Sequence, residues 1–287
     1  MTTNWDKLSY PRLCALAGKN PTRLSQAMHN AAYAHAGLPF TYVAINTENT
    51  ASVISAVREL GMRGLSLTIP HKEAAVSLVD TCSEEAKAIG AINTVVNDGS
   101  SLFGHNTDTY GIRAAFAEAG ITLNGKTVLI LGAGGAARAA AAVVSGAGAA
   151  NCFVSNRSTE RAVALASDFS INSLAWDKCN DLVCSESSLV LINATPIGSH
   201  LAPQGADFPF ELSLVPSSCC VLDMATTPKT ALTIACDKAG GIAVSGLRML
   251  LHQAAKQVEL FTESAATLSV LEKALYDCLK LPAPGAS

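Results

Sequence analysis

The sequence predicts an α/β protein with two domains, of which the second is built on a doubly wound parallel sheet. Strand-like and helix-like segments alternate along nearly the whole chain. After residue 126 the strand-like runs are continuously apolar, as in parallel strands that helices cover on both faces. The chain has 287 residues, which fits one large or two medium domains, and only 15% of them are charged, so much of it should be buried.

Charge and composition argue against several classes of protein. The net charge is −3 without a long run of one sign, which disfavours nucleic-acid and membrane-surface partners. The start MTTNWDKLSYPRL lacks the features of a signal peptide, and no apolar run reaches the roughly 20 residues needed to cross a bilayer. The nine cysteines form no C-x-x-C pair and no zinc-ligand spacing, so we expect buried thiols in a reducing cytoplasm and no metal.

The first region reads as alternating strands and helices that end in a hairpin. Strands are expected at 12–18, 41–46 and 64–69, and helices at 25–36, 50–60, 72–79 and 83–89. Ser25 is expected to cap the first helix, and Pro70 stops the third strand. The stretch AINTVVNDGSSLFGHN predicts a hairpin whose turn is Asp98-Gly99.

A helix at 107–120 leads into the second region, where the strand and helix pattern repeats. Strands are expected within KTVLIL, NCFVSN, LVLINATPIG, CCVLDMATT and GIAVSG, with helices after the first glycine turn and at 158–168 and 229–239. Two last helices follow at 247–262 and 264–280, and the tail LPAPGAS is expected to be frayed. Periodicity alone leaves open which domain these last helices join.

The stretch LILGAGGAARA contains the pattern G-x-G-x-x-A at Gly132, Gly134 and Ala137. Gly132 would make the tight turn, and Gly134 would let the backbone approach a pyrophosphate at the start of the next helix. The pattern follows a strand and opens a helix, which is the context that favours a dinucleotide site over an empty turn. The residues expected to contact the cofactor here are Gly132, Ala133, Gly134, Gly135 and Ala136.

The end of the next strand favours NADP over NAD. An NAD site would place an acidic residue there for the ribose hydroxyls. This chain instead has SNRSTER, with Asn156, Arg157, Ser158 and Arg161. Two arginines and a hydroxyl can bind a 2′-phosphate, although Arg161 on a solvated helix start would simply face water.

Four side chains are candidates for moving the proton of an alcohol substrate. Lys72 follows a strand end in LTIPHKE, and Asp108 lies in GHNTDTYG at the expected seam of the two domains, where such enzymes bind substrate. His71 and His105 are rival bases, since histidine is the commonest acid–base residue. The spacing alone does not decide among them.

In sequence, the chain resembles the shikimate dehydrogenase family nearly from end to end, and most of all its divergent shikimate dehydrogenase-like (shikimate/quinate) branch. The matching stretches are SQAMHN, GLSLTIPHKEAA, GAINTVV, GHNTDTYGI, LGAGGAARA, SNRSTERA, LINATPIG and SGLRMLLHQAA. The resemblance implies a substrate-binding catalytic domain at 1–108 plus 247–287 and a Rossmann NADP-binding domain at 109–246.

The resemblance also implies site residues. Lys72 and Asp108 match the catalytic pair that bonds the reacting hydroxyl, and Ser25 matches one of two serines that hold the substrate carboxylate. The positions that match ligands of the ring hydroxyls are Thr68, Asn93 and Gln253. The positions that match the NADP-selecting cluster and the nicotinamide side are Asn156, Arg157, Ser158, Arg161, Thr195, Met224 and Gly246.

Three positions depart from the family pattern, all on the substrate side. Arg23, or Thr22 if the loop is shifted, takes the place of the first clamp serine. Thr226 replaces a tyrosine, and Ser66 replaces an asparagine. Arg23 would bind the substrate carboxylate more strongly than a serine or else point to solvent.

The sequence thus predicts an NADP-dependent oxidoreductase that interconverts shikimate and 3-dehydroshikimate, with a Lys/Asp pair handling the alcohol proton. The substrate is a small carboxylate, and either a monomer or a homodimer is possible. A quinate or amino-shikimate dehydrogenase is one alternative. A catalytically weak NADPH-binding sensor is another, although such a sensor need not keep Lys72 and Asp108.

Overall fold

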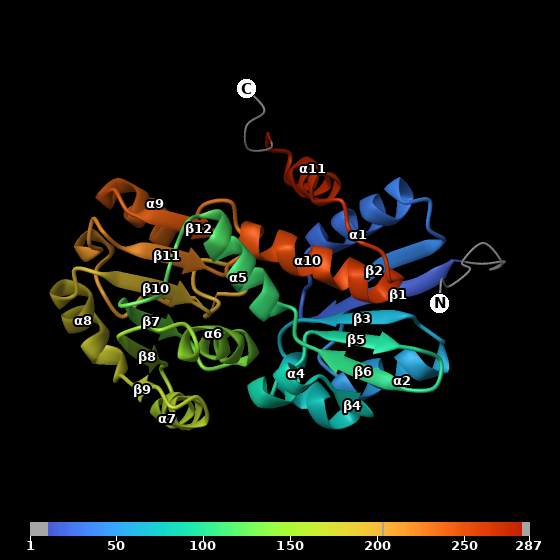
Figure 1. Cartoon of the computed structure of the whole chain (residues 1–287), viewed down its shortest axis with the longest axis horizontal. Coiled ribbons are helices and arrows are strands. Elements are labelled where there is room, and N and C mark those ends of the chain that lie inside the picture. Colours follow the sequence, from blue (N-terminus) through green and yellow to red (C-terminus); the bar gives the residue numbers. More distant parts are fainter. Residues whose placement is uncertain (1–10, 203, 283–287) are drawn as a thin grey trace. The chain divides into compact units, whose positions relative to one another are not determined.

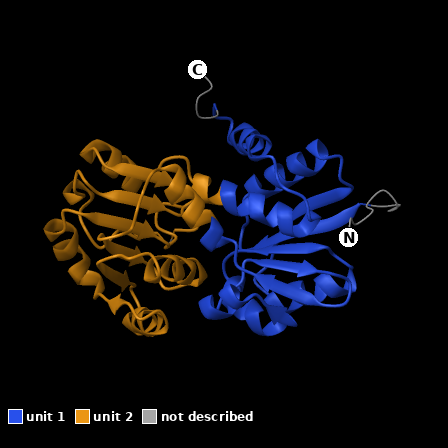
Figure 2. Ribbon diagram, viewed as in Figure 1, with its two compact units in different colours: residues 1–110, 251–287 blue, residues 111–250 orange. Residues whose placement is uncertain are grey.

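The computed structural model describes residues 11–202 and 204–282 of the chain (Figure 1). The predictions of an N-terminus without a signal peptide and of a frayed tail concern residues 1–10 and 283–287, which lie outside the described residues. The chain divides into two compact units (Figure 2). Unit 1 comprises residues 1–110 and 251–287, and unit 2 comprises residues 111–250.

Unit 1 contains a six-stranded mixed sheet in the order β2-β1-β3-β5-β6-β4. The strands are β1 (Arg12–Gly18), β2 (Phe40–Asn46), β3 (Gly64–Leu67), β4 (Thr81–Cys82), β5 (Thr94–Asn97) and β6 (Leu102–His105). Strand β1 is parallel to β2 and β3, whereas β5 is antiparallel to both of its neighbours. The hairpin β5–β6 closes over a loop in which the Asp98 carboxylate accepts from the backbone N–H groups of Ser100 and Ser101 at 2.8 Å.

The helices and helical turns of unit 1 are α1 (Leu24–His35), α2 (Thr50–Glu59), α3 (His71–Ala74), η2 (Ala75–Leu78), α4 (Glu84–Ile89) and α11 (Leu268–Leu279). Helix α1 packs on β1 and β2, α4 packs on β6, and α11 packs on α1. Leu65 and Leu67 of β3 join the core on one face, and Gly64 and Ser66 alternate with them toward the other. A Cβ atom on Gly64 would lie 2.3 Å from the ring of Phe261, which belongs to helix α10 (Gly246–Thr262). Only glycine at position 64 therefore lets α10 pack this closely on the sheet.

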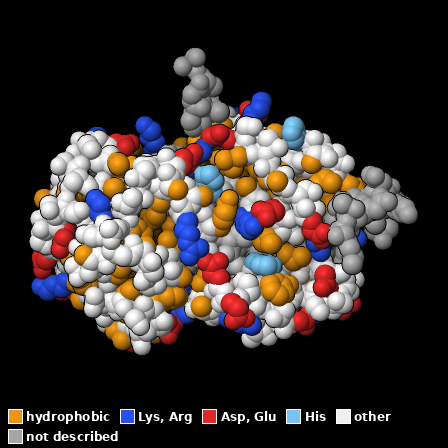
Figure 3. Space-filling model, viewed as in Figure 1, with side chains coloured by type: hydrophobic (Ala, Val, Ile, Leu, Met, Phe, Trp, Pro, Cys, Tyr) orange, Lys and Arg blue, Asp and Glu red, His pale blue; other side chains and the backbone are white. Residues whose placement is uncertain are grey.

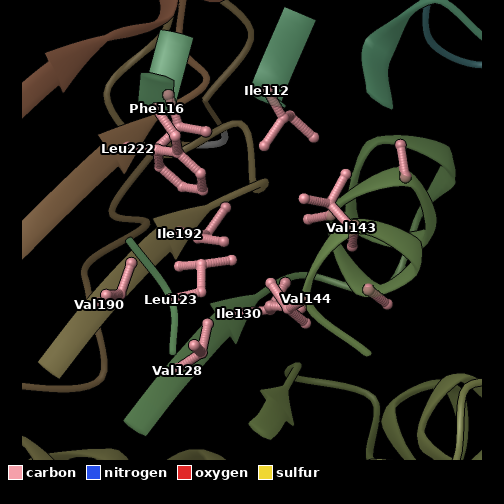
Figure 4. Packing of buried hydrophobic residues seen from close by; sticks show 14 of the residues in the cluster. Ile112, Phe116, Leu123, Val128, Ile130, Val143, Val144, Val190, Ile192 and Leu222 are labelled. Carbon is pink, nitrogen blue, oxygen red and sulfur yellow. The ribbon is translucent and has the colours of Figure 1, made fainter. Parts of the chain in front are cut away.

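Unit 2 is a doubly wound fold with all six strands parallel, in the order β12-β11-β10-β7-β8-β9. The strands are β7 (Thr127–Leu131), β8 (Asn151–Ser155), β9 (Asn172–Ser173), β10 (Leu189–Asn193), β11 (Cys220–Asp223) and β12 (Ile242–Ser245). Side chains on successive positions of β7 and β10 enter two separate apolar cores, so each strand is buried on both faces. Figure 4 shows one of these cores, in which Ile130 and Ile192 lie among residues from the neighbouring helices. The predicted α/β fold class is confirmed.

The helices and helical turns of unit 2 are α6 (Gly135–Ser145), α7 (Thr159–Asp168), η3 (Trp176–Lys178), α8 (Cys179–Ser185), η4 (Leu212–Leu214) and α9 (Ala231–Ala239). Helices α5 (Asp108–Glu118) and α10 (Gly246–Thr262) each begin in one unit and end in the other. The sequence analysis missed the short elements β4, β9, α8, η3 and η4, because two to seven residues are too few for a periodic pattern.

The predicted cap of the first helix was wrong. Helix α1 begins one residue earlier, at Leu24, so Ser25 lies inside its first turn and Arg23 occupies the cap position without a capping hydrogen bond from its side chain. The backbone of Arg23, at φ −81° and ψ 2°, is already close to helical, so the helix begins nearer the N-terminus than predicted.

The nine cysteines are all free, and six of them are buried. Within residues 11–202 and 204–282, no helix has both the length and the apolar character that spanning a membrane requires. In the same part of the chain, no group of three His, Cys, Asp or Glu side chains is placed to hold a metal ion. On the face drawn in Figure 3, Lys and Arg side chains are interspersed with Asp and Glu.

Candidate active site

The topology of unit 1 gathers the polar candidates at one edge of its sheet. Strands β1 and β3 are parallel, so the residues after both of them emerge at the same edge. Ser66 of β3 lies opposite Thr94, the first residue of antiparallel β5, and Thr94 in turn lies opposite His105, the last residue of β6. The start of α1, the turn before α3, Asn93 and the start of α5 therefore all adjoin this edge.

Lys72 and Asp108 meet at this edge. Lys72 Nζ donates to Asp108 Oδ2 at 2.6 Å, and the two side chains are 15% and 5% exposed. Lys72 is held in place through its backbone, since its carbonyl accepts from Ile92 N–H at 2.8 Å. The Asn106 side chain accepts from Asp108 N–H at 3.0 Å, which positions the start of α5. The result is a short ion pair whose lysine stays partly exposed to solvent.

Asn93 extends the pair into a network. Its Nδ2 donates to Asp108 Oδ1 at 2.9 Å and to Gln253 Oε1 at 3.2 Å. Its Oδ1 accepts from the backbone N–H of Thr107 at 2.8 Å and from the Thr94 hydroxyl at 2.8 Å. The structure thus brings together four residues that the sequence analysis singled out, and adds Thr94 and Thr107, which it missed.

The two rival histidines have other surroundings. Both ring nitrogens of buried His71 are occupied, since Nε2 lies 2.9 Å from the Thr47 carbonyl and Nδ1 lies 2.7 Å from the Thr50 hydroxyl. A carbonyl can only accept, so Nε2 carries the proton and His71 serves to fix the loop after β2. The His105 ring lies 4.6 Å from the Phe103 ring, tilted by 45°, and both burial and the charge of Lys256 lower the pKa of His105. Among the described residues, neither histidine side chain is hydrogen-bonded to Lys72 or Asp108.

The residues expected on the substrate side, apart from Asn93 and Gln253, lie outside the hydrogen-bond network of Lys72 and Asp108. Ser25 is buried in the first turn of α1, whereas Arg23 is exposed, and no ion pair of Arg23 occurs among the described residues. The Ser66 hydroxyl is buried beside the Tyr42 hydroxyl, where it opposes the rise that burial causes in the pKa of Tyr42. Thr68 lies half-buried beside Gly18, where a Cβ atom would be 2.2 Å from its methyl group. None of these four side chains has a described hydrogen bond to the Lys72–Asp108 pair.

In unit 2, the glycine turn lies where the strand order reverses. The chain runs from β7 outward through β8 and β9, then returns to β10 on the other side of β7. Gly132 follows β7 with φ +110°, and a Cβ atom on it would lie 2.9 Å from the Ala194 carbonyl oxygen after β10. Gly134 caps α6 without a side-chain hydrogen bond, so the first N–H groups of that helix remain available to an anion. Ala133, Gly135 and Ala136 complete this turn.

The predicted NADP-selecting residues surround the start of α7. Ser158 caps the helix by accepting from Arg161 N–H at 3.4 Å, and Asn156 Nδ2 donates to the Ser158 carbonyl at 3.1 Å. Arg161 donates from Nη2 to the Ala133 carbonyl at 3.0 Å, so this side chain lies against the glycine turn. Arg157 is exposed. The guanidinium of Arg161 therefore adjoins the place where a pyrophosphate would bind.

A buried carboxylate that the sequence analysis missed organises the loops after β10 and β11. Asp223 accepts from Asn193 Nδ2 at 2.8 Å, from Ala225 N–H at 3.1 Å and from the Thr230 hydroxyl at 2.6 Å. Asn193 Oδ1 accepts in turn from the Thr195 hydroxyl at 2.6 Å. Burial raises the pKa of Asp223, and these three donors oppose the shift. The sequence carried one sign of this site, namely that Asp223 is a polar residue at the end of the otherwise apolar strand β11.

The last two predicted cofactor positions belong to the same loops. Met224 follows β11, and its N–H donates to the Asn193 carbonyl at 2.9 Å. A Cβ atom on Gly246 would lie 2.5 Å from the Ala225 carbonyl oxygen, so the start of α10 requires glycine for this close approach. Thr195, Met224 and Gly246 thus share the carboxyl edge of one parallel sheet with the glycine turn.

A doubly wound sheet with a glycine turn at its switch point is the architecture of dinucleotide-binding α/β proteins. Three family descriptions match this chain: "Shikimate dehydrogenase substrate binding domain" over residues 20–95, "Shikimate / quinate 5-dehydrogenase" over 115–204 and "Shikimate 5'-dehydrogenase C-terminal domain" over 246–276. The chain belongs to the shikimate dehydrogenase family. The resemblance inferred from the sequence is thereby confirmed at the level of the family.

Individual relatives match over most of the chain. The "Shikimate dehydrogenase (NADP(+))" of Symbiobacterium thermophilum is 35% identical over 268 residues, which are 89% of this chain and 90% of the relative. A shikimate 5-dehydrogenase of Thermus thermophilus, solved with NADP(H) and shikimate, is 35% identical with a TM-score of 0.80, covering 93% and 99% of the two chains. The quinate dehydrogenase of Corynebacterium glutamicum, solved with NAD, is 28% identical with a TM-score of 0.83, covering 94% and 100%. Placement in the divergent branch stays a prediction.

Proposed function

We propose that this chain is an NADP-dependent dehydrogenase that interconverts shikimate and 3-dehydroshikimate. The observation that carries the proposal is the buried network of Lys72, Asp108, Asn93 and Gln253, in a chain that belongs to this family. A lysine beside a carboxylate can give a proton to the carbonyl oxygen as a ketone is reduced, and the neutral amine that remains can take the proton back as the alcohol is oxidised. Membership of the family and the fold class support the same activity.

We assign a task to each member of the network. Lys72 Nζ exchanges the proton with the reacting hydroxyl, and Asp108 holds that nitrogen in place through the 2.6 Å contact. Gln253, whose Oε1 accepts from Asn93, would present its Nε2 to a ring hydroxyl of the substrate, and Asn93 would bind a second ring hydroxyl by giving up one of its present partners. The side chains are preorganised by hydrogen bonds with each other, which lowers the cost of aligning them during the reaction.

The carboxylate end of the substrate is assigned to the start of α1. Ser25 lies in the first turn of that helix, whose N-terminus favours an anion, and Arg23 adds a positive charge there. Ser66 and Thr68 line the adjoining strand end. These four assignments are proposals that the variants below test.

The residues of unit 2 fit NADP. The glycine turn has no room for a side chain at Gly132, and the uncapped start of α6 faces the same turn. Arg157 and Arg161, with Asn156 and Ser158, would hold the 2′-phosphate. Thr195, Met224 and Gly246 would border the nicotinamide, which supplies the hydride acceptor when the cofactor is bound.

A panel of substrates and a variant test the proposal together. Purified protein is assayed with shikimate, quinate and amino-shikimate, each with NADP and NAD, and kcat/KM is compared. Shikimate with NADP should give the highest kcat/KM, and Lys72→Ala should lower kcat by a factor of about 10² to 10⁴ without weakening NADPH binding. Wild-type turnover in Lys72→Ala would reject the proposed roles, and tight NADPH binding without any turnover would favour a sensor.

Quinate is the second candidate substrate. The matching family description includes quinate dehydrogenases, and the quinate dehydrogenase of Corynebacterium glutamicum is 28% identical to this chain with a TM-score of 0.83. A higher kcat/KM for quinate than for shikimate in the same panel would establish this alternative.

A further inference from the structure

Behind the Lys72–Asp108 pair, a chain of hydrogen bonds runs through the interior of unit 1. Gln257 of α10 is buried, and its Nε2 donates to the Thr94 hydroxyl oxygen at 2.9 Å. The Thr94 hydroxyl donates to Asn93 Oδ1 at 2.8 Å, and Asn93 Nδ2 donates to Asp108 Oδ1 at 2.9 Å. Four side chains are thus linked in series, from the last long helix to the carboxylate.

The direction of these hydrogen bonds is fixed by chemistry. The amide nitrogen of Gln257 can only donate, so the Thr94 oxygen must accept from it. The single hydroxyl proton of Thr94 then points to Asn93, and the oxygen of the Asn93 amide faces Thr94. The Asn93 oxygen also accepts from the Thr107 N–H at 2.8 Å, so the amide nitrogen of Asn93 is directed at Asp108.

His29 stands at the far end of the same chain. It is fully buried, its Nδ1 lies 3.0 Å from the Tyr33 hydroxyl, and burial lowers its pKa to about 3, so the ring is neutral. Gln257 opposes this lowering, as an acceptor beside the ring would. His29 Nε2 and Gln257 Oε1 are both buried, and neither makes a regular hydrogen bond, so an Nε2–H of His29 and the Gln257 oxygen would complement each other.

We propose that Gln257, through Thr94, is a positioning residue that acts together with the Thr107 N–H to fix the orientation of the Asn93 amide, and so the donor that Asn93 presents to Asp108. His29 supports Gln257 from behind. The proposal rests on the proposed function, because it assigns Asp108 to the reacting pair. Neither Gln257 nor Thr94 donates to Lys72 or Asp108 directly, so both act only through Asn93.

The polarity of the chain suggests a pair of substitutions at Thr94. Thr94→Val keeps the shape of the side chain but removes the hydroxyl, whereas Thr94→Ser keeps the hydroxyl and removes a buried methyl group. We expect Thr94→Val to lower kcat about tenfold and Thr94→Ser to restore it, although the serine variant should have the lower Tm of the two. Gln257→Met, which removes both amide atoms at similar volume, should lower kcat like Thr94→Val.

Thr262→Val is the matched control. Thr262 is a buried residue of the same helix, and its hydroxyl donates to the Val258 carbonyl at 2.7 Å, outside the chain that leads to Asn93. This variant should lose a comparable amount of Tm and keep the kcat of the wild type. The KM for NADPH should be unchanged in all four variants.

The outcomes separate this inference from the proposed function. If kcat follows Tm across the four variants, or if Thr94→Val and Gln257→Met turn over like the wild type while Lys72→Ala is inactive, the positioning role is rejected and the proposed function stands. If Lys72→Ala itself turns over normally, both fail together. A loss of kcat that follows the hydroxyl at position 94 rather than Tm supports the inference.

Discussion

Two buried carboxylates, one in each unit, have different hydrogen-bond partners and are therefore suited to different roles. Asp108 of unit 1 faces the ammonium of Lys72 at 2.6 Å, and that lysine retains 15% exposure. Asp223 of unit 2 is fully buried and accepts only from neutral donors, namely the Asn193 amide, the Ala225 N–H and the Thr230 hydroxyl. A carboxylate beside a reachable cation suits proton transfer, whereas one saturated by neutral donors suits holding loops in place.

The largest expected effect separates these two carboxylates directly. Asp108→Asn should lower kcat by a factor of about 10² to 10⁴, because the lysine loses its charged partner. Asp223→Asn should change kcat only slightly but lower the free energy of unfolding by about 1–3 kcal/mol, because one buried donor or acceptor is left mispaired. Steady-state kinetics and urea unfolding of both variants provide the measurement. Equal losses of kcat in the two variants would contradict a catalytic role for Asp108 and a structural role for Asp223.

The next effect concerns cofactor choice, which should depend on unit 2 alone. Arg157→Ala and Arg161→Ala together should reduce the preference for NADP over NAD by roughly 10- to 100-fold, because two charge-assisted bonds to the 2′-phosphate are lost. The KM for shikimate should stay the same. Arg138→Ala is the control, since Arg138 pairs with Asp168 at 2.8 Å. A preference that survives in the double variant would remove these arginines from the cofactor site.

Acid should affect the two units in opposite directions. The folded pKa of His29, about 3, lies below the ordinary value of about 6.5, so its contribution to stability is complete above pH 6.5 and falls toward pH 3, by up to about 1.4 kcal/mol per pH unit. The pKa of Asp223 is raised, so its contribution is present at low pH and is lost as pH rises through the folded pKa.

Hydrogen exchange between pH 7 and pH 4 measures this difference. Amides of β1 and β3 in unit 1 should lose protection as the pH falls, and His29→Gln should flatten that loss. Amides of β10 and β11 should show no loss that depends on His29. If the His29→Gln variant keeps the pH slope of the wild type in unit 1, another group is responsible.

The smallest expected effect is at the carboxylate end of unit 1. Arg23 is exposed, and exposed ion pairs contribute about 0.2–1 kcal/mol, so Arg23→Ala should raise the KM for shikimate no more than about fivefold. NADP affinity should be unaffected. Arg58→Ala, at an exposed arginine of unit 1 that pairs with Asp80, is the control. An unchanged KM for shikimate in Arg23→Ala would show that Arg23 does not bind the substrate carboxylate.

The sequence predicted the architecture of unit 2 better than its interior contacts. Apolar runs and the glycine pattern are local signals, and they led to β7, the turn at Gly132 and the parallel order of the sheet. Asp223 and Asn193 escaped notice because each is one polar residue at a strand end, and their contact joins positions 30 residues apart. Nothing in the local pattern marks such a pair.

The substrate side divides in the same way. Lys72 and Asp108 were found through motifs, although spacing alone left His71 and His105 as rivals until the contacts of His71 were seen. Gln257 was missed altogether, since its bond to Thr94 spans 163 residues and a glutamine within an amphipathic helix reads as a surface residue. Long-range polar contacts of this kind require coordinates.

The division of the chain has a consequence for the order in which the protein is made. Unit 2 is one continuous segment, residues 111–250, so its fold needs no residue that is synthesised after position 250. Unit 1 needs residues 251–287 as well, because Phe261 packs on Gly64 and Gln257 bonds Thr94. During synthesis, the later-encoded unit can therefore complete its fold first, while the unit that begins the chain must wait, with an open sheet face, for its last helices.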